Sequence, residues 1–177
     1  MKRIISIMLV SIMLITSVFT LCSCGGTKFS FELNADGASY KLVGMENAKG
    51  AVVIPSTYND LPVTKIGKSS IDGKAHLTSL VFPDSIIEIE GDAFSGNLNK
   101  LESITIGKNV TYIGDYAFTT SATLEFKEIN YCGTPEQWKA LCRYTTYTYN
   151  GEEKESTKVY NDDKVTVNYN CTMPAEK

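Results

Sequence analysis

The sequence has one histidine, His76, and one tryptophan among its 177 residues. A catalytic triad or a histidine-rich metal site would therefore have only one imidazole to use. The five cysteines never form a CxxC pair, and Asp162 and Asp163 lack the ligand spacing of an EF-hand calcium loop. No glycine-rich phosphate-binding motif is present. These absences predict a protein that is not an enzyme and that uses no metal or other cofactor.

Acidic residues are missing from the start of the chain, since none precedes Glu32. The chain has 17 basic and 20 acidic residues, a net charge of −3; without Lys2 and Arg3, 15 basic residues remain against 20 acidic ones, a net charge of −5. A mildly acidic protein is a poor electrostatic partner for a polyphosphate or an anionic membrane surface. We therefore expect no nucleic-acid partner.

The N-terminal segment has the pattern of an export signal. A basic pair is followed by a nearly uninterrupted apolar run over 4–19, and small or reactive residues end that run. This order is typical of a signal peptide, here residues 1–23. The ending LCSC at 21–24 is similar to a lipobox, in which the final cysteine becomes the first mature residue and carries diacylglycerol.

Cys24 is the predicted lipidation site, and residues 24–28, which include two glycines, are the expected lipidated tether. Two or three acyl chains hold a protein stably on a membrane. We expect an exported protein, anchored to the cell envelope through the lipid on Cys24 and facing outward or the periplasm. An uncleaved apolar anchor is the alternative, although the run is short for ~30 Å of hydrocarbon.

Cleavage before Cys24 changes the cysteine inventory. Cys132, Cys142 and Cys171 would remain for the folded domain, which is an odd number. An exported location permits a disulfide. Pairing of Cys142 with Cys171, pairing of Cys132 with Cys142, or no disulfide at all are the alternatives that the sequence leaves open.

An internal repeat is the main feature of the domain. The segment LTSLVFPDSIIEIEGDAF at 77–94 aligns with LESITIGKNVTYIGDYAF at 101–118, a shift of 24 positions. Degenerate copies flank these two, with an insertion over 56–62 in the upstream copy and a shifted copy that begins at Phe126. Such a ladder predicts a solenoid, because stacked coils bury one continuous core. The matched apolar positions are Leu77 and Leu101, Leu80 and Ile104, Phe82 and Ile106, Ile86 and Val110, Ile89 and Ile113, Ala93 and Ala117, and Phe94 and Phe118.

These motifs resemble the BspA-type leucine-rich repeats of bacterial surface proteins. The resemblance extends over residues 50–141 and includes IPSTYNDLPVTKIG at 54–67 and the closing INYCGTPEQWKAL at 129–141. The sequence departs from the usual pattern at Ile71, which replaces an Ala-Phe ending, and at Gly91, which falls one place late. The resemblance implies a non-enzymatic surface lipoprotein that acts in protein binding or adhesion.

Short segments that flank the repeats are expected to cover the ends of the solenoid. Residues 29–50 predict an N-terminal β cap, a hairpin that turns at Asp36-Gly37. Residues 51–133 are then the solenoid, and residues 134–177 a capping helix and β tail. Thr134 and Gln137 have the spacing of a capping box for that helix. We thus expect a mainly β fold with short helical segments and about three to four coils.

The C-terminal tail predicts short strands. Alternation over 144–149 and 165–169 is typical of strands, Asn150-Gly151 marks a turn, and the charged stretch 152–158 is expected to be a mobile loop.

Two surfaces are candidates for binding. Residues between the apolar anchors of each strand point away from the core and should form one exposed sheet face, with an unidentified protein of the host or the envelope as partner. The tyrosines of the tail, if exposed, would instead suit a carbohydrate-binding accessory module. The candidate face consists of Ser79, Val81, Ser103, Thr105, Glu128 and Asn130, and the candidate aromatic contacts are Tyr144, Tyr147 and Tyr149.

Overall fold

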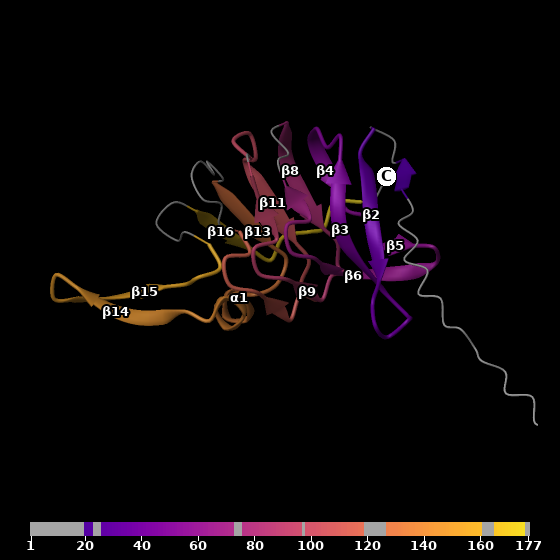
Figure 1. Ribbon diagram of the computed structural model, residues 1–177. Helices are drawn as coiled ribbons and strands as arrows, with labels where there is room; N and C mark the ends of the chain where they lie inside the picture. Colours follow the sequence, from indigo (N-terminus) through magenta and orange to yellow (C-terminus); the bar gives the residue numbers. More distant parts are fainter. Residues whose placement is uncertain are drawn as a thin grey trace, which may run out of the picture.

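The computed structural model describes residues 20–22, 26–72, 76–96, 98–118, 127–160 and 165–175. Strands dominate these ranges, and they stack side by side along one axis (Figure 1). No helix within the described part is long and apolar enough to cross a membrane. This architecture confirms the predicted fold class, a mainly β solenoid with a short helical segment. The predicted signal peptide and Cys24 lie outside the described residues, apart from residues 20–22.

The first strands of successive coils form one parallel sheet, in the order β16-β13-β11-β8-β4. Its register aligns Leu80 with Ile104 and Ile104 with Ile129, all of them buried. The matched apolar anchors therefore stack as one row of the core, as the repeat predicts. The strands are β4 (Gly50–Val53), β8 (Leu77–Phe82), β11 (Ser103–Ile106), β13 (Glu128–Tyr131) and β16 (Thr166–Tyr169).

The structure adds a second sheet, in the order β1-β2-β3-β6-β9-β12, with β5 beside β6. Ile66, Ile89 and Ile113 point into the core from this side and are fully buried. Each of the coils 50–72, 77–95 and 103–118 thus supplies one strand to the parallel sheet and one strand to the second sheet. The strands are β1 (Thr20–Cys22), β2 (Lys28–Leu33), β3 (Tyr40–Glu46), β5 (Thr57–Tyr58), β6 (Leu61–Ile66), β9 (Glu88–Ile89) and β12 (Tyr112–Ile113).

The end of each coil forms a third line of contacts. β7 (Ile71–Asp72) pairs in parallel with β10 (Phe94–Ser95), so Ile71 occupies the place of the missing Ala-Phe. The amide of Phe94 donates to the carbonyl of Ala117 at 3.2 Å, and the amide of Phe118 donates to the carbonyl of Val159 at 3.0 Å. Residues 158–160 therefore take the position of a further coil ending, although they lie about forty positions later in the chain.

A glycine contact holds the second and third coils at close distance. A Cβ added to Gly114 would lie 2.1 Å from the amide nitrogen of Gly91, and one added to Gly91 would lie 2.7 Å from the carbonyl oxygen of Asp115. The backbones thus approach to a distance that only glycine allows. This contact gives a physical reason for the shifted position of Gly91.

The N-terminal hairpin is present as predicted. β2 and β3 pair antiparallel, and β3 also pairs in parallel with β6 of the first coil. The Asp36 carboxylate accepts hydrogen bonds from the amides of Ala38 (2.8 Å) and Ser39 (3.2 Å), which fixes the turn and lowers the pKa of this carboxyl. β1 pairs antiparallel with β2, although it belongs to the segment that the sequence predicts to be removed.

The fourth coil, residues 128–160, replaces its second strand with α1 (Pro135–Cys142). The capping box is present, because the Thr134 hydroxyl accepts from the amide of Gln137 and the Gln137 side chain accepts from the amide of Thr134. Trp138 is buried and its ring lies 5.2 Å from that of Tyr131. The helix therefore covers the core of the last coil, as predicted.

The expectation of a mobile loop over 152–158 is wrong for most of that stretch. β14 (Thr145–Tyr149) and β15 (Glu152–Ser156) form an antiparallel hairpin that projects from the solenoid next to α1 (Figure 1). Asn150 and Gly151, with φ of 51° and 80°, make the predicted turn. A two-residue turn of this kind enforces cross-strand pairing, which outweighs the low strand propensity of the charged residues.

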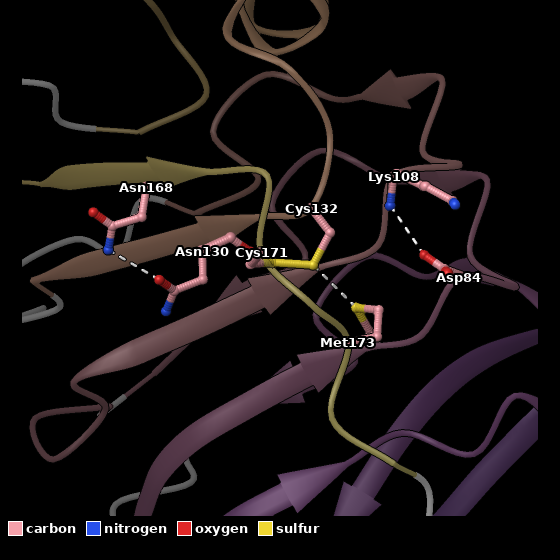
Figure 2. Close-up of a disulfide and its surroundings, with 7 residues drawn as sticks. All are labelled: Asp84, Lys108, Asn130, Cys132, Asn168, Cys171 and Met173. Carbon is pink, nitrogen blue, oxygen red and sulfur yellow. Dashed lines mark hydrogen bonds between the residues drawn. A yellow bond between two sulfur atoms is a disulfide. The ribbon is translucent and has the colours of Figure 1, made fainter.

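A disulfide joins Cys132 to Cys171, which is neither of the two pairs considered from the sequence (Figure 2). β16 lies beside β13 in parallel, with Tyr169 opposite Tyr131, so the residues just after both strands come together. Cys142 is instead buried in α1 and free. Burial raises the pKa of the Cys142 thiol to about 12.

Candidate functional site

The outer face of the parallel sheet brings together all six residues of the predicted face. Their side chains are half-buried, whereas the intervening anchors are buried, because neighbouring residues of a strand point to opposite sides. In the register of the sheet, the six residues form two rows that run across β8, β11 and β13. Each row continues by one residue onto β4 and by one residue onto β16. One row is Ala51, Ser79, Ser103, Glu128 and Thr166, and the other is Val53, Val81, Thr105, Asn130 and Asn168.

The two rows change in character along the solenoid. The first three coils contribute small aliphatic and hydroxyl side chains, whereas β13 and β16 together add a glutamate and two asparagines beside Thr166. The Asn168 amide donates to the Asn130 side-chain oxygen at 2.9 Å (Figure 2). It also donates to the Glu128 carboxylate. Glu128 is the only charged residue of this ten-residue face.

Four of these ten residues were missed by the sequence reasoning. Ala51 and Val53 lie in the degenerate first copy, and Thr166 and Asn168 come from the tail, about forty positions after β13. The alternation around Val167 predicts a strand, but it does not show that this strand pairs with β13. The disulfide from Cys132 to Cys171 keeps β16 next to β13 and thus completes the face.

The three tyrosine candidates do not form one site. Tyr144 is half-buried, and its hydroxyl forms a hydrogen bond with that of Tyr160. Tyr149 is 57% exposed on the hairpin, with the Lys154 ammonium 5.1 Å from its ring centre. Tyr147 lies in β14, and its side chain is outside the described part.

Charged groups gather on the second sheet rather than on this face. The Lys65 ammonium forms an ion pair with the Glu88 carboxylate, with an N–O distance of 2.6 Å, and this contact raises the pKa of Lys65. Arg143 bonds to Asp115 at 2.6 Å and lies 5.3 Å from the ring centre of Tyr112. These ion pairs join neighbouring coils, which indicates a structural role. In the described ranges, no group of three or more His, Cys, Asp or Glu residues could hold a metal ion.

The Arg143 guanidinium also covers the edge of the second sheet at β12. The amide of Glu90 donates to the carbonyl of Ile66 at 2.9 Å, and that of Gly114 donates to the carbonyl of Ile89 at 2.8 Å. At the next step the donor is Arg143, whose Nη1 lies 2.8 Å from the carbonyl oxygen of Ile113. A side chain thus satisfies the backbone acceptor that another coil would otherwise satisfy.

Several solved structures are similar to the chain. A leucine-rich repeat protein from Bacteroides capillosus is 27% identical, with a TM-score of 0.49, over 64% of this chain and 89% of that one. A leucine rich cell surface protein from Faecalibacterium prausnitzii is 27% identical, with a TM-score of 0.43, over 64% of this chain and 33% of that one. A leucine-rich repeat protein of T. pallidum is 21% identical, with a TM-score of 0.45. That match covers 57% of this chain and 50% of the T. pallidum protein.

The family assignment comes from the repeats. No curated protein matches the sequence. The family model for the BspA type leucine rich repeat region matches residues 52–141 in six copies, and this range includes the strands β8, β11 and β13 that present the central part of the face. The chain therefore belongs to the BspA-type leucine-rich repeat family.

Proposed function

We propose that this chain is an exported lipoprotein of the cell envelope that binds a protein through the outer face of its parallel sheet. The observation that carries the proposal is the alignment of ten side chains in two rows across five strands. Repeat folds commonly use such regular surfaces to bind partners. Binding is therefore the activity that this geometry supports best.

The chemistry of the face suits a protein surface. Small side chains on β4, β8 and β11 leave the sheet accessible, and the amides of Asn130 and Asn168 offer hydrogen bonds at one end. Five strands at ~4.8 Å spacing extend over about 20 Å. A stable partner would also contact the adjoining loops, because a standard interface buries about 800 Å² on each side.

The cell-envelope location rests on the predicted lipobox and on the family. The F. prausnitzii protein described above is named as a cell surface protein. Lipidation at Cys24 would attach the domain through its N-terminal hairpin, and cleavage there would also remove β1 and free the outer edge of β2.

The binding proposal is tested by site-specific photocross-linking from the full chain on intact cells of the producing bacterium. A photoreactive residue at Thr105, in the centre of the face, should capture a defined protein. The same residue at Thr57, which is exposed on β5, should not capture it. Asn130→Arg should abolish capture from position 105 and lower stability by no more than about 1 kcal/mol, because it also removes the acceptor of one exposed hydrogen bond from Asn168. Equal capture from both positions would refute the role of the face.

The anchor is tested separately by mass spectrometry of the membrane fraction. A mature N-terminus at Cys24 that carries diacylglycerol is expected. Cys24→Ser should release the protein from the membrane, whereas Cys22→Ser should leave the anchor intact. An unmodified Cys24 in the mature protein would contradict the lipoprotein assignment and would leave the binding face untouched.

A carbohydrate-binding role for the tyrosines has weaker support. Tyr144 packs against Tyr160, and the Lys154 ammonium covers part of the ring of Tyr149. We therefore favour the sheet face.

A further inference from the structure

The projecting hairpin has two free edges. Among the residues that the structure describes, no third strand pairs with β14 or β15 (Figure 1). Its link to the body includes the ion pair between Lys139 of α1 and Glu155, with an N–O distance of 2.8 Å. A two-stranded hairpin is at best marginally stable alone in water. Addition of further strands would therefore stabilise this element.

The two edges differ in charge. β14 reads TTYTY and has no charged residue, whereas the EEKES sequence of β15 contains three glutamates and a lysine. Charged side chains on an edge strand oppose the addition of another strand. The β14 edge is therefore the one that accepts a partner strand.

The hairpin register shows which backbone groups this edge offers. Positive φ values at both turn residues fit a type I′ turn, whose flanking residues Tyr149 and Glu152 form a hydrogen-bonded pair. Hydrogen-bonded pairs alternate with non-bonded ones, so Tyr147 also bonds across the hairpin. The amides and carbonyls of Thr146 and Thr148 therefore point outward.

We infer that the β14 edge binds a second copy of this chain. In an antiparallel pair about a twofold axis, Thr146 would lie opposite Thr148 of the copy, and Tyr147 opposite Tyr147. The outward amides and carbonyls then form four backbone hydrogen bonds. The product is a four-stranded sheet, β15-β14-β14-β15, which has two strands more than either hairpin alone.

Charge decides in favour of this arrangement. Pairing through β14 leaves the charged β15 strands outermost, separated by both β14 strands. Pairing through β15 would place Glu152, Glu153 and Glu155 of the two copies side by side, which is unfavourable. The contact is smaller than a standard interface, so the dimer forms at high protein concentration, roughly 0.1–1 mM in solution.

Cysteine cross-linking of the purified full chain tests this register. Opposite residues of a non-bonded antiparallel pair have Cα atoms about 4.5 Å apart, within the range of a disulfide. Tyr147→Cys should therefore give a disulfide-linked dimer under mild oxidation. Thr145→Cys is the matched control, because its copy would lie about 14 Å away along the strand. Equal cross-linking of both variants would overturn the inference.

A proline pair tests the edge. Adding Thr148→Pro removes one outward amide of β14 and should abolish the Tyr147→Cys dimer. Glu153→Pro removes the equivalent amide of β15 and should leave the dimer intact. Loss of the dimer with each of the two prolines, or its survival with Thr148→Pro, would contradict self-association through β14.

Discussion

Replacement of Gly114 by alanine tests whether the close approach of the second and third coils holds the solenoid together. The new Cβ would meet the amide nitrogen of Gly91 at 2.1 Å and its Cα at 2.6 Å. These atoms belong to the backbone, so the coils must separate locally. The hydrogen bond from the Gly114 amide to the carbonyl of Ile89, 2.8 Å long, would be weakened by the same movement.

The expected magnitude follows from these two effects. Overpacking costs about 1–3 kcal/mol, and a weakened hydrogen bond adds about 1 kcal/mol. Alanine recovers about 0.5 kcal/mol by restricting the unfolded chain. Gly114→Ala should therefore lower the free energy of unfolding by about 1.5–3.5 kcal/mol, which corresponds to a fall in melting temperature of roughly 3–14 °C for a domain of this size.

Gly44→Ala is the matched control for this prediction. A Cβ at Gly44 would have only the Ser30 Cβ within 4 Å, at 3.9 Å, and the backbone there is not left-handed. The variant should thus be neutral or more stable by up to about 1 kcal/mol. Urea unfolding followed by circular dichroism measures both variants. A Gly114→Ala protein as stable as Gly44→Ala would refute the argument from coil contact.

Three further predictions concern the C-terminal half. Arg143→Met should lower stability by about 2 kcal/mol, since the carbonyl of Ile113 loses a charged donor; Lys154→Met, at the exposed hairpin, should have little effect in the same urea titration. Cys171→Ser should cost up to about 4 kcal/mol, because the disulfide closes a loop with a sequence separation of 39, and a reductant should then have no further effect. Burial raises the pKa of Cys142 from 9.0 to about 12, so the unfolded chain ionises first as pH rises. Stability is then full below pH 9 and is lost between pH 9 and 12, by about 1 kcal/mol at pH 10. Cys142→Ala should remove this part of the pH dependence, and an unchanged profile would count against a buried neutral thiol.

The repeat was enough to predict the three central strands of the parallel sheet, β8, β11 and β13, and their register. A shift of 24 positions aligns Leu80 with Ile104, and the structure pairs these residues as neighbours. The same alignment predicted the central rows of the face. The sequence does not predict the strands β9 and β12 of the second sheet, because each has two residues and is too short to show an alternating pattern.

Long-range contacts of the tail could not be predicted. The pairing of β16 with β13 depends on the path of the intervening helix and hairpin, so the partner of Cys171 was hidden. Residues 158–160 carry no repeat motif, yet Val159 is buried where a coil ending belongs. Their position follows from stacking against Phe118, which is a property of the folded chain.

The return of residues 158–160 to the stack has a consequence for how this protein can vary. The chain leaves the solenoid after α1 and rejoins it at residues 158–160. The hairpin of β14 and β15 between these points can therefore lengthen or shorten without a change in the stack. Each pair of residues added to both strands would extend its reach by about 7 Å. The hairpin, and with it the edge that β14 presents, can therefore change in length while the scaffold that carries it stays the same.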